Sequence, residues 1–264
     1  MAHLRIATFN CAGLGATTRR KAIFEQLRKS DAQILCLQET HSTTLEEHKW
    51  ALEWGRSRAL FHSNLKNDRS NGVAFLLNHS DLSFTNWHGD QHGRIVTADF
   101  STREESIHIV NIYAPQSGHP TKERSKFFNS LYVYIHSTHP TILTGDFNCV
   151  ENPMLDRHPP SNRKDNTLAL RELCETFRLR DTFRAAHGDA RLFTRRQANV
   201  QSRIDRFYAS DIITPQSEQT LPGLASDHDL VVLQIKNVTI LTRGSGKWKE
   251  QHLHLRRRTF SKPF

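Results

Sequence analysis

The sequence is poor in cysteine and has no long hydrophobic run. Its four cysteines, Cys11, Cys36, Cys149 and Cys174, lie far apart, and no two of them form a Cys-x-x-Cys pair. A structural zinc site needs ligands at closer spacing than this. We therefore expect four reduced, buried thiols, which is the usual state of cysteine in an intracellular protein.

No run of 18 apolar residues exists, so no segment is expected to span a membrane and no membrane partner is predicted. Residues 1–7 already mix apolar with polar side chains, which predicts that the chain carries no secretion signal. Internal repeats and low-complexity blocks are also lacking. The apolar content of 37% is nevertheless enough for a core, and 264 residues fit one large α/β domain or two small ones.

Basic residues outnumber acidic ones. The chain has 36 Lys and Arg against 27 Asp and Glu, a net charge of +9, and 16 histidines. This balance favours polyanionic partners, although a solvated basic surface without a partner is an equal alternative until a site is found. From about Asn237 the sequence turns polar and basic. We expect a folded domain over residues 1–236 and a basic linker or tail over 237–264 that leads toward a further region.

Short apolar strands alternate with amphipathic helices along the domain. The predicted strands are residues 4–9, 34–37, 59–62, 72–77, 94–100, 107–113, 141–144 and 229–235. The predicted helices are residues 19–30, with Thr17 and Thr18 as caps, and 44–54, 121–137 and 168–177. Residues 192–209 predict a hairpin that turns at Gln197-Ala198-Asn199. Because hairpin-like pairs interrupt the alternation, we predict a mixed α/β domain of two face-to-face sheets with helices outside.

Polar residues stand repeatedly at or just after the ends of these apolar strands. They are Asn10, Glu39, Tyr113, Asp146, Asn148, Asp205, Asp227 and His228. Any one of them alone is typical of a turn or of the surface. Together they supply oxygen ligands for a hard cation such as Mg²⁺, and acid and base groups for phosphate chemistry. Since strand ends commonly line active sites, this set predicts an active site at one edge of the sheets.

The strings TFNCAGLG, LQET, NIYAP, GDFN, SRID and SDHDLV occur in this order between residues 4 and 236. They resemble the endonuclease/exonuclease/phosphatase superfamily, which includes DNase I, the abasic-site endonucleases and the endonuclease domains of non-LTR retrotransposons. The resemblance implies a DNase I-like, four-layered sandwich of two mixed β-sheets flanked by helices. It also implies a phosphodiesterase that uses Mg²⁺, with Mn²⁺ able to substitute.

The resemblance also implies roles for the polar set. Glu39 is similar to the main metal ligand of the family, and Asn10 to the residue that supports it. His228 resembles the histidine that faces the phosphate, with Asp205 as the carboxylate that orients it. Asp146 matches the residue that polarises the attacking water.

Three further residues complete the implied set. Asn148 is similar to the residue that helps to place the attacking water. Tyr113 would donate to a phosphate oxygen or, as a phenolate, stabilise the transition state. Asp227 would orient the site or bind metal. The implied reaction is in-line attack by water on a phosphodiester, which leaves a 3′ hydroxyl and a 5′ phosphate.

The choice of substrate rests on other features. The repair enzymes that act at abasic sites carry an aspartate where this chain has Ala12. In the retrotransposon endonucleases a hairpin reaches the DNA minor groove, and arginine favours narrow grooves. In this chain the matching hairpin predicts DNA contacts by Thr194, Arg195, Arg196, Ser202 and Arg203. An exposed basic hairpin without groove contact is the alternative.

Residues 244–249 resemble the segment between the endonuclease and the reverse transcriptase of retrotransposon polyproteins. The resulting hypothesis is an endonuclease that nicks target DNA in the nucleus to prime integration. Its predicted partners are double-stranded DNA and a reverse transcriptase region of the same polyprotein. The alternatives are an abasic-site repair endonuclease, a phosphatase of small or lipid phosphates, and a catalytically inactive DNA-binding module.

Overall fold

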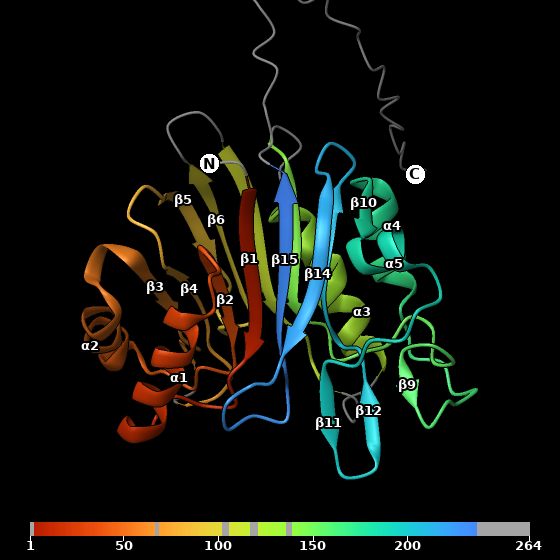
Figure 1. The fold of residues 1–264 in the computed structure, drawn as a ribbon, viewed down its shortest axis with the longest axis horizontal. Helices are drawn as coiled ribbons and strands as arrows, with labels where there is room; N and C mark the ends of the chain where they lie inside the picture. Colours follow the sequence, from red (N-terminus) through yellow and green to blue (C-terminus); the bar gives the residue numbers. More distant parts are fainter. Residues whose placement is uncertain (1–2, 67–68, 102–105, 117–120, 136–138, 237–264) are drawn as a thin grey trace, which may run out of the picture.

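Two six-stranded sheets pack face to face and form the body of the molecule (Figure 1). The computed structural model describes residues 3–66, 69–101, 106–116, 121–135 and 139–236. The first sheet contains, in spatial order, β14 (Pro215–Leu221), β15 (Leu230–Lys236), β1 (His3–Asn10), β2 (Ile34–Gln38), β4 (Val73–Leu77) and β3 (Ala59–His62). The second contains β10 (Leu179–Asp181), β13 (Asp205–Ser210), β8 (Thr141–Asp146), β7 (Ser106–Tyr113), β6 (Ile95–Ser101) and β5 (Ser83–Gly89).

Both sheets are mixed. In the first sheet β1 and β2 run parallel, and in the second β7 and β8 run parallel, while the other pairings are antiparallel. The parallel pairs are those whose strands end in the polar residues of the catalytic set. Their carboxyl ends therefore open at the same edge of the molecule, where the arrowhead of β1 lies in Figure 1.

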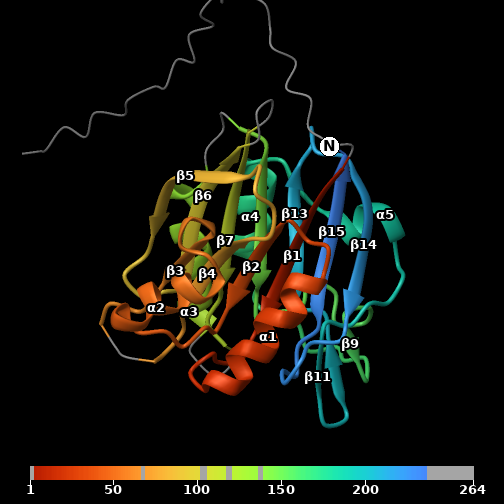
Figure 2. The ribbon, with the colours of Figure 1, turned by 60° about the vertical axis from the view of Figure 1, so that its left-hand side comes forward.

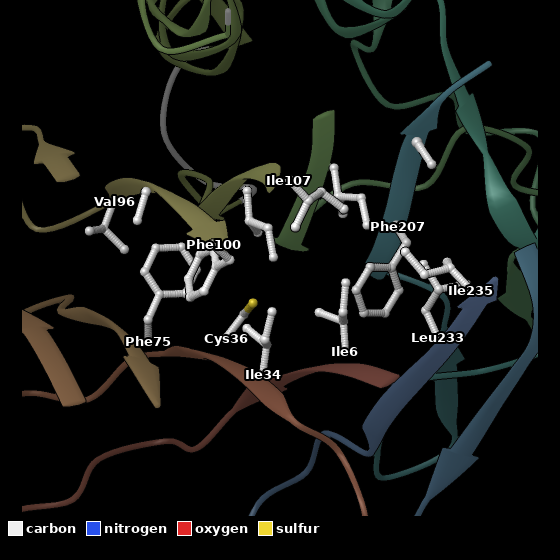
Figure 3. Packing of buried hydrophobic residues seen from close by; sticks show 14 of the residues in the cluster. Ile6, Ile34, Cys36, Phe75, Val96, Phe100, Ile107, Phe207, Leu233 and Ile235 are labelled. Atoms are coloured by element: carbon white, nitrogen blue, oxygen red, sulfur yellow. The ribbon is translucent and has the colours of Figure 1, made fainter. Parts of the chain in front are cut away.

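Apolar side chains from the inner faces of the two sheets form the central core (Figure 3). Ile6 and Phe75 of the first sheet meet Phe100 and Phe207 of the second, and the rings of Phe75 and Phe100 pack edge to face at 4.9 Å. Each of these strands is buried on both faces, because helices cover the outer sides. The core thus fixes the two sheets against each other along their length.

Helices cover the outer face of each sheet, which gives four layers (Figure 2). On the first sheet, α1 (Thr17–Lys29) and α2 (Thr44–Trp54) bury Phe24 and Trp54 against the strands. On the second, α3 (Thr121–Ser130) and α4 (Leu168–Thr176) bury Phe128 and Leu170. The short helix α5 (Thr182–His187) contacts both β13 and β14. None of the helices in the described residues is long and apolar enough to cross a membrane.

A third, three-stranded sheet projects from the edge at which the polar strand ends lie (Figures 1 and 2). It consists of β11 (Arg195–Gln197), β12 (Val200–Ser202) and β9 (Arg157–His158). Strands β11 and β12 form the predicted hairpin and turn at Ala198 and Asn199. The pairing of β12 with β9 was not predicted, because a two-residue strand leaves no periodic pattern in the sequence.

Several element boundaries in the structure differ from those predicted from the sequence. Helix α1 begins at Thr17 with Ala16 as its cap and no side-chain capping bond, so the prediction that Thr17 and Thr18 cap it is wrong. The third predicted helix ends at Ser130 and continues as a 3₁₀ turn over Leu131–Val133, while residues 136 and 137 lie outside the described residues. The predicted tail, 237–264, and its segment 244–249 also lie outside them. The four cysteines are free and buried, as expected.

Candidate active site

The candidate site lies where the strand ends of the two sheets meet. Asn10 closes β1, Glu39 directly follows β2, and Tyr113 and Asp146 close β7 and β8. The register places Asp146 between Tyr113 and Asp205, the first residue of β13. Residues that are far apart in the sequence thus come together because parallel neighbours end at the same level.

Tight backbone packing fixes the position of Asp146. The preceding Gly145 has φ +133°, and a Cβ there would lie 2.0 Å from the carbonyl oxygen of Ile112, so only glycine fits. The Oδ1 atom of Asp146 accepts a hydrogen bond from the backbone N–H of Asn148 at 2.8 Å. The Asn148 side chain in turn donates to the carbonyl oxygen of Ala114 at 2.8 Å. Asp146 and Asn148 of the GDFN string are therefore held rigidly.

Asn10 joins the two carboxylates of the site. Its Nδ2 donates to Glu39 Oε1 and to Asp146 Oδ2, each at 3.0 Å. Its own Oδ1 accepts from the backbone N–H of Ala12 at 3.0 Å, which fixes the orientation of the amide. A side chain that can donate two bonds from one nitrogen is required here, and this explains an asparagine between two acids.

His228 and Asp205 form a buried dyad. The Nδ1 atom of His228 lies 3.0 and 2.9 Å from the two oxygens of Asp205. Thr194 donates its hydroxyl to Asp205 Oδ2 at 2.6 Å and completes the arrangement. The other ring nitrogen, Nε2, faces Asp146 Oδ2 at 4.0 Å and Asp227 Oδ1 at 3.9 Å. Nδ1 is therefore occupied, while Nε2 is directed into the site.

The electrostatics of the site separate an acid from a base. Burial, reinforced by the neighbouring Asp205 carboxylate, raises the pKa of Asp146 to about 7, although His228 opposes the change. Burial by itself favours the neutral ring of His228, but the Asp205 carboxylate outweighs it and raises the pKa of His228 to about 9. Near neutral pH the site thus holds an imidazolium beside a carboxyl group whose pKa suits proton transfer.

Tyr113 is buried beside Glu39. Burial, together with the negative charge of Glu39, raises the pKa of the Tyr113 hydroxyl well above its usual range. The guanidinium of Arg94 lies 4.9 Å from the centre of the ring, and Gln116 Nε2 donates to the hydroxyl oxygen at 3.0 Å. Of the two roles considered for this residue, these surroundings favour the neutral phenol as a hydrogen-bond donor over the phenolate.

The oxygen ligands fit a hard cation. Asp146, Asp205 and His228 place one ligand atom each within 4.8 Å of one another. Asp205, however, is already bonded to His228 and Thr194, so these three groups form the dyad and its neighbour. Glu39 and Asp146 share a single amide donor and keep further lone pairs, which is the oxygen-rich environment that Mg²⁺ prefers. Glu39 is therefore the better candidate ligand, with Asp146 and Asn10 beside it.

Two of the predicted DNA-contacting residues are buried, and the predictions for them are wrong. Arg203 is 1% exposed and forms ion pairs with Asp156 at 2.8 Å and Asp181 at 2.6 Å. Thr194 is fully buried and supports Asp205. Both belong to the base of the hairpin, where the side chains turn into the protein.

The other predicted contacts lie on the hairpin itself. Arg195 Nε donates to Asp227 Oδ2 at 2.8 Å, and Arg196 forms an ion pair with Asp229. Ser202 is half-buried at the end of β12. DNA contact by these three residues remains a prediction. The two ion pairs could not be predicted from the sequence, since the hairpin and residues 227–229 are distant in the chain.

His41 is a further neighbour of the site that the sequence analysis missed. Its Nε2 lies 3.6 Å from Glu39 Oε2, on the side opposite to Asn10. Its position shortly after Glu39 in the string LQETH is the only signal that could have indicated it.

Comparison with known proteins decides the family. Residues 7–228 match the sequence model described as the Endonuclease/Exonuclease/phosphatase family. The chain belongs to this family. The match begins within β1 and ends at His228, so it encloses every residue of the candidate catalytic set. The resemblance drawn from the motifs is confirmed.

Relatives in the family include a transposon protein. The chain is 34% identical over 245 residues to the Transposon TX1 uncharacterized 149 kDa protein of Xenopus laevis, which covers 88% of this chain. The chain spans only 18% of the length of that relative. It is 25% identical to an Exodeoxyribonuclease of Bacillus subtilis, with 88% and 99% of the two chains covered. It is also 25% identical to the DNA repair nuclease APEX1 of Danio rerio, with 88% and 82% covered.

Solved structures of the family share the fold. The catalytic domain of Xenopus laevis APE2 matches with a TM-score of 0.74 at 21% identity, over 88% of this chain and 92% of that one. The 3′-5′ exonuclease NExo of Neisseria meningitidis matches with a TM-score of 0.71 at 18% identity, over 88% and 100%. The predicted DNase I-like sandwich is therefore confirmed.

Proposed function

We propose that this chain is the endonuclease domain of a retrotransposon protein and nicks one strand of duplex target DNA. The nick would leave a 3′ hydroxyl from which a reverse transcriptase region of the same protein primes synthesis. The proposed place of action is the nucleus. The observation that carries the proposal is a complete hydrogen-bonded catalytic set in a chain that is 34% identical to a transposon protein.

The geometry supports hydrolysis of a phosphodiester. Asp146 accepts a proton from the attacking water, since its pKa is about 7. Asn148 helps to place that water. The cationic His228 directs Nε2–H toward a non-bridging phosphate oxygen, and the Tyr113 hydroxyl donates a second hydrogen bond. As the water oxygen bonds to phosphorus, the bond from phosphorus to the 3′ oxygen breaks, and the 3′ oxygen takes up a proton from solvent, which leaves a 3′ hydroxyl and a 5′ phosphate.

We propose Mg²⁺ as the cofactor, with Mn²⁺ able to substitute. Glu39 would hold the ion, with Asp146 and Asn10 beside it, and this matches the oxygen-rich donor set of the site. When bound, such an ion neutralises negative charge that develops on the leaving oxygen. His41, 3.6 Å from Glu39 Oε2, would limit the directions in which the Glu39 carboxylate can turn.

Abasic-site repair is the second candidate function, and the likeness to a DNA repair nuclease favours it. Ala12 argues against it, because the repair enzymes carry a carboxylate at the matching position. Ala12 contributes to the site only its backbone N–H, which donates to Asn10 Oδ1, and its side chain offers no metal ligand. The two functions differ in substrate, since a retrotransposon endonuclease acts on an intact duplex.

The test compares nicking of a supercoiled plasmid with cleavage of a duplex that contains one abasic analogue. We expect nicking of the intact plasmid in Mg²⁺ and Mn²⁺, none in EDTA, and none for Glu39→Ala. Sequencing of the products should show 3′ hydroxyl and 5′ phosphate ends. Efficient cleavage of the abasic duplex with an untouched plasmid would assign the chain to repair, and activity that persists in EDTA would exclude both functions.

A further inference from the structure

The first strand of the hairpin pairs with the segment that carries His228. Arg195 and His228 face each other across an isolated antiparallel bridge. The backbone N–H of Arg196 donates to the carbonyl oxygen of Asp227 at 2.8 Å, and that of Asp229 donates to Thr194 at 2.6 Å. Because residues that face each other in such a pair project to the same side, the Arg195 side chain lies next to the catalytic histidine.

Two carboxylates lie close to the Nε2 atom of His228. Asp146 Oδ2 is 4.0 Å away and Asp227 Oδ1 is 3.9 Å away. Each is just outside hydrogen-bond distance, so a shift of about 1 Å would bring either one onto the imidazolium as a charged hydrogen bond. The proposed function requires this N–H for the phosphate, and such a bond would occupy it.

Other donors restrain both carboxylates. Asp146 is held by Asn10 Nδ2 and by the backbone N–H of Asn148. Among the described residues, Asp227 has one side-chain hydrogen-bond donor, Arg195, whose Nε lies 2.8 Å from Asp227 Oδ2. The Asp227 side chain is 35% exposed, so it has room on the solvent side to turn once the guanidinium is removed.

We propose that Arg195 is a positioning residue that holds the Asp227 carboxylate away from His228 Nε2 and keeps this N–H available to the phosphate. The inference rests on the proposed function and goes beyond it, because it gives Arg195 a role in the chemical step. Removal of the guanidinium frees Asp227 to turn toward the imidazolium and to form a competing ion pair.

Kinetics of the Arg195→Met variant test this role. At saturating DNA we expect kcat to fall by about 10–100-fold, the usual range for loss of an orienting partner. In an Asp227→Ala background the same substitution should cost less than about twofold, because the competing carboxylate is gone. Arg180→Met is the matched control, since Arg180 forms an exposed ion pair with Asp211 at 2.7 Å and belongs to neither the catalytic set nor the hairpin, and it should cost little in either background.

DNA affinity in EDTA separates this role from a simple phosphate contact. If Arg195 acts only as a positioning residue and the predicted DNA contact is not made, Arg195→Met should bind DNA within about twofold of the wild type, with an unchanged salt slope. A phosphate contact would instead lower the slope by about one. Equal losses of kcat in both backgrounds, or a weakened affinity that explains the loss, would overturn the proposal.

Proton NMR of the His228 ring gives a readout that does not depend on the substrate. In Arg195→Met we expect a downfield Nε2–H resonance from the new bond to Asp227, and this resonance should be missing in Arg195→Met/Asp227→Ala. An unchanged ring resonance in Arg195→Met would contradict the inference even if the plasmid is nicked. A wild-type chain that does not nick DNA would instead refute the proposed function alone.

Discussion

At the scale of single residues, Asp146 carries the largest share of the proposed chemistry. Asp146→Asn keeps the shape of the side chain and removes the proton acceptor, so nicking should fall by at least about 100-fold. DNA affinity should stay nearly unchanged, because Asp146 is 1% exposed and offers little surface for binding. Plasmid nicking and filter binding measure the two effects. Nicking within about threefold of the wild type would remove Asp146 from its assigned role.

Thr194 offers a second test at this scale. Its hydroxyl donates to Asp205 and accepts the backbone N–H groups of Ile204 and Asp205, at 3.2 and 3.1 Å. Thr194→Val removes all three bonds with little change of volume, and kcat should fall by about 10–100-fold. Thr194→Ser keeps the hydroxyl and is the matched control. Equal activity of the two variants would show that Asp205 needs no such support.

The residue types of the site could be predicted from the sequence, but the directions of several side chains could not. Asn10, Glu39 and Asp146 follow apolar strands in recognisable strings, and parallel strands bring such ends together. Arg203 also stands in such a string and Thr194 in the predicted hairpin, yet both side chains point inward. Which face of a short strand is buried depends on its partners, here Asp156 and Asp205, and these lie far away in the sequence.

At the scale of elements, a buried ionic network anchors the hairpin. Asp156 is fully buried between Arg203 and Arg184, and Arg203 also pairs with Asp181, which caps α5. Arg203→Met leaves both carboxylates without their main cation, and breaking such a pair costs about 3–5 kcal/mol of unfolding free energy. Urea denaturation measures this loss. The exposed pair of Arg180 with Asp211 is the control, since Arg180→Met should cost about 0–1 kcal/mol.

The tip of the hairpin is the part that remains free to contact DNA. Arg195 and Arg196 are ion-paired, whereas Val200 is 49% exposed and Ala198 takes a left-handed turn conformation. Replacement of residues 197–200 by a Gly/Ser turn leaves the ion pairs intact. If the tip reads groove shape, the positions of nicks on a long mixed-sequence duplex should change. An unchanged pattern with less total cleavage would show that the tip contributes to DNA affinity and not to the choice of nick position.

At the scale of the whole molecule, the sequence predicts the buried strands better than the edges. Strands such as β2 and β4, which are buried throughout, appear in the sequence as apolar runs. The edge strands β5 and β14 were not predicted, because they are mostly exposed and rich in Ser, Thr, Asn and Gln. Edge strands gain their pairing from a neighbour and not from their own periodicity. The two-sheet sandwich could therefore be inferred from the sequence, while the number of strands in each sheet could not.

One hydrogen bond joins the two sheets at such an edge. The hydroxyl of Thr182 in α5, which follows β10 of the second sheet, donates to Glu218 of β14 in the first. Burial raises the pKa of Glu218 to about 7 from an ordinary value of 4.5. The fold therefore favours the protonated acid. The contribution of Glu218 to the free energy of unfolding is complete below about pH 4.5 and is lost as the pH rises through about 7.

Glu218→Gln resembles the protonated acid and should remove this dependence. The wild type should lose unfolding free energy between about pH 4.5 and 7, and the variant should lose less. Because part of the Glu218 side chain meets solvent, we expect a difference of about 1–2 kcal/mol at pH 8, less than the shift would give for complete burial. Urea denaturation at several pH values measures it. Parallel curves of unfolding free energy against pH for the two proteins would show that the fold does not raise the pKa of Glu218. The contact between the two sheets at this edge would then depend on packing alone.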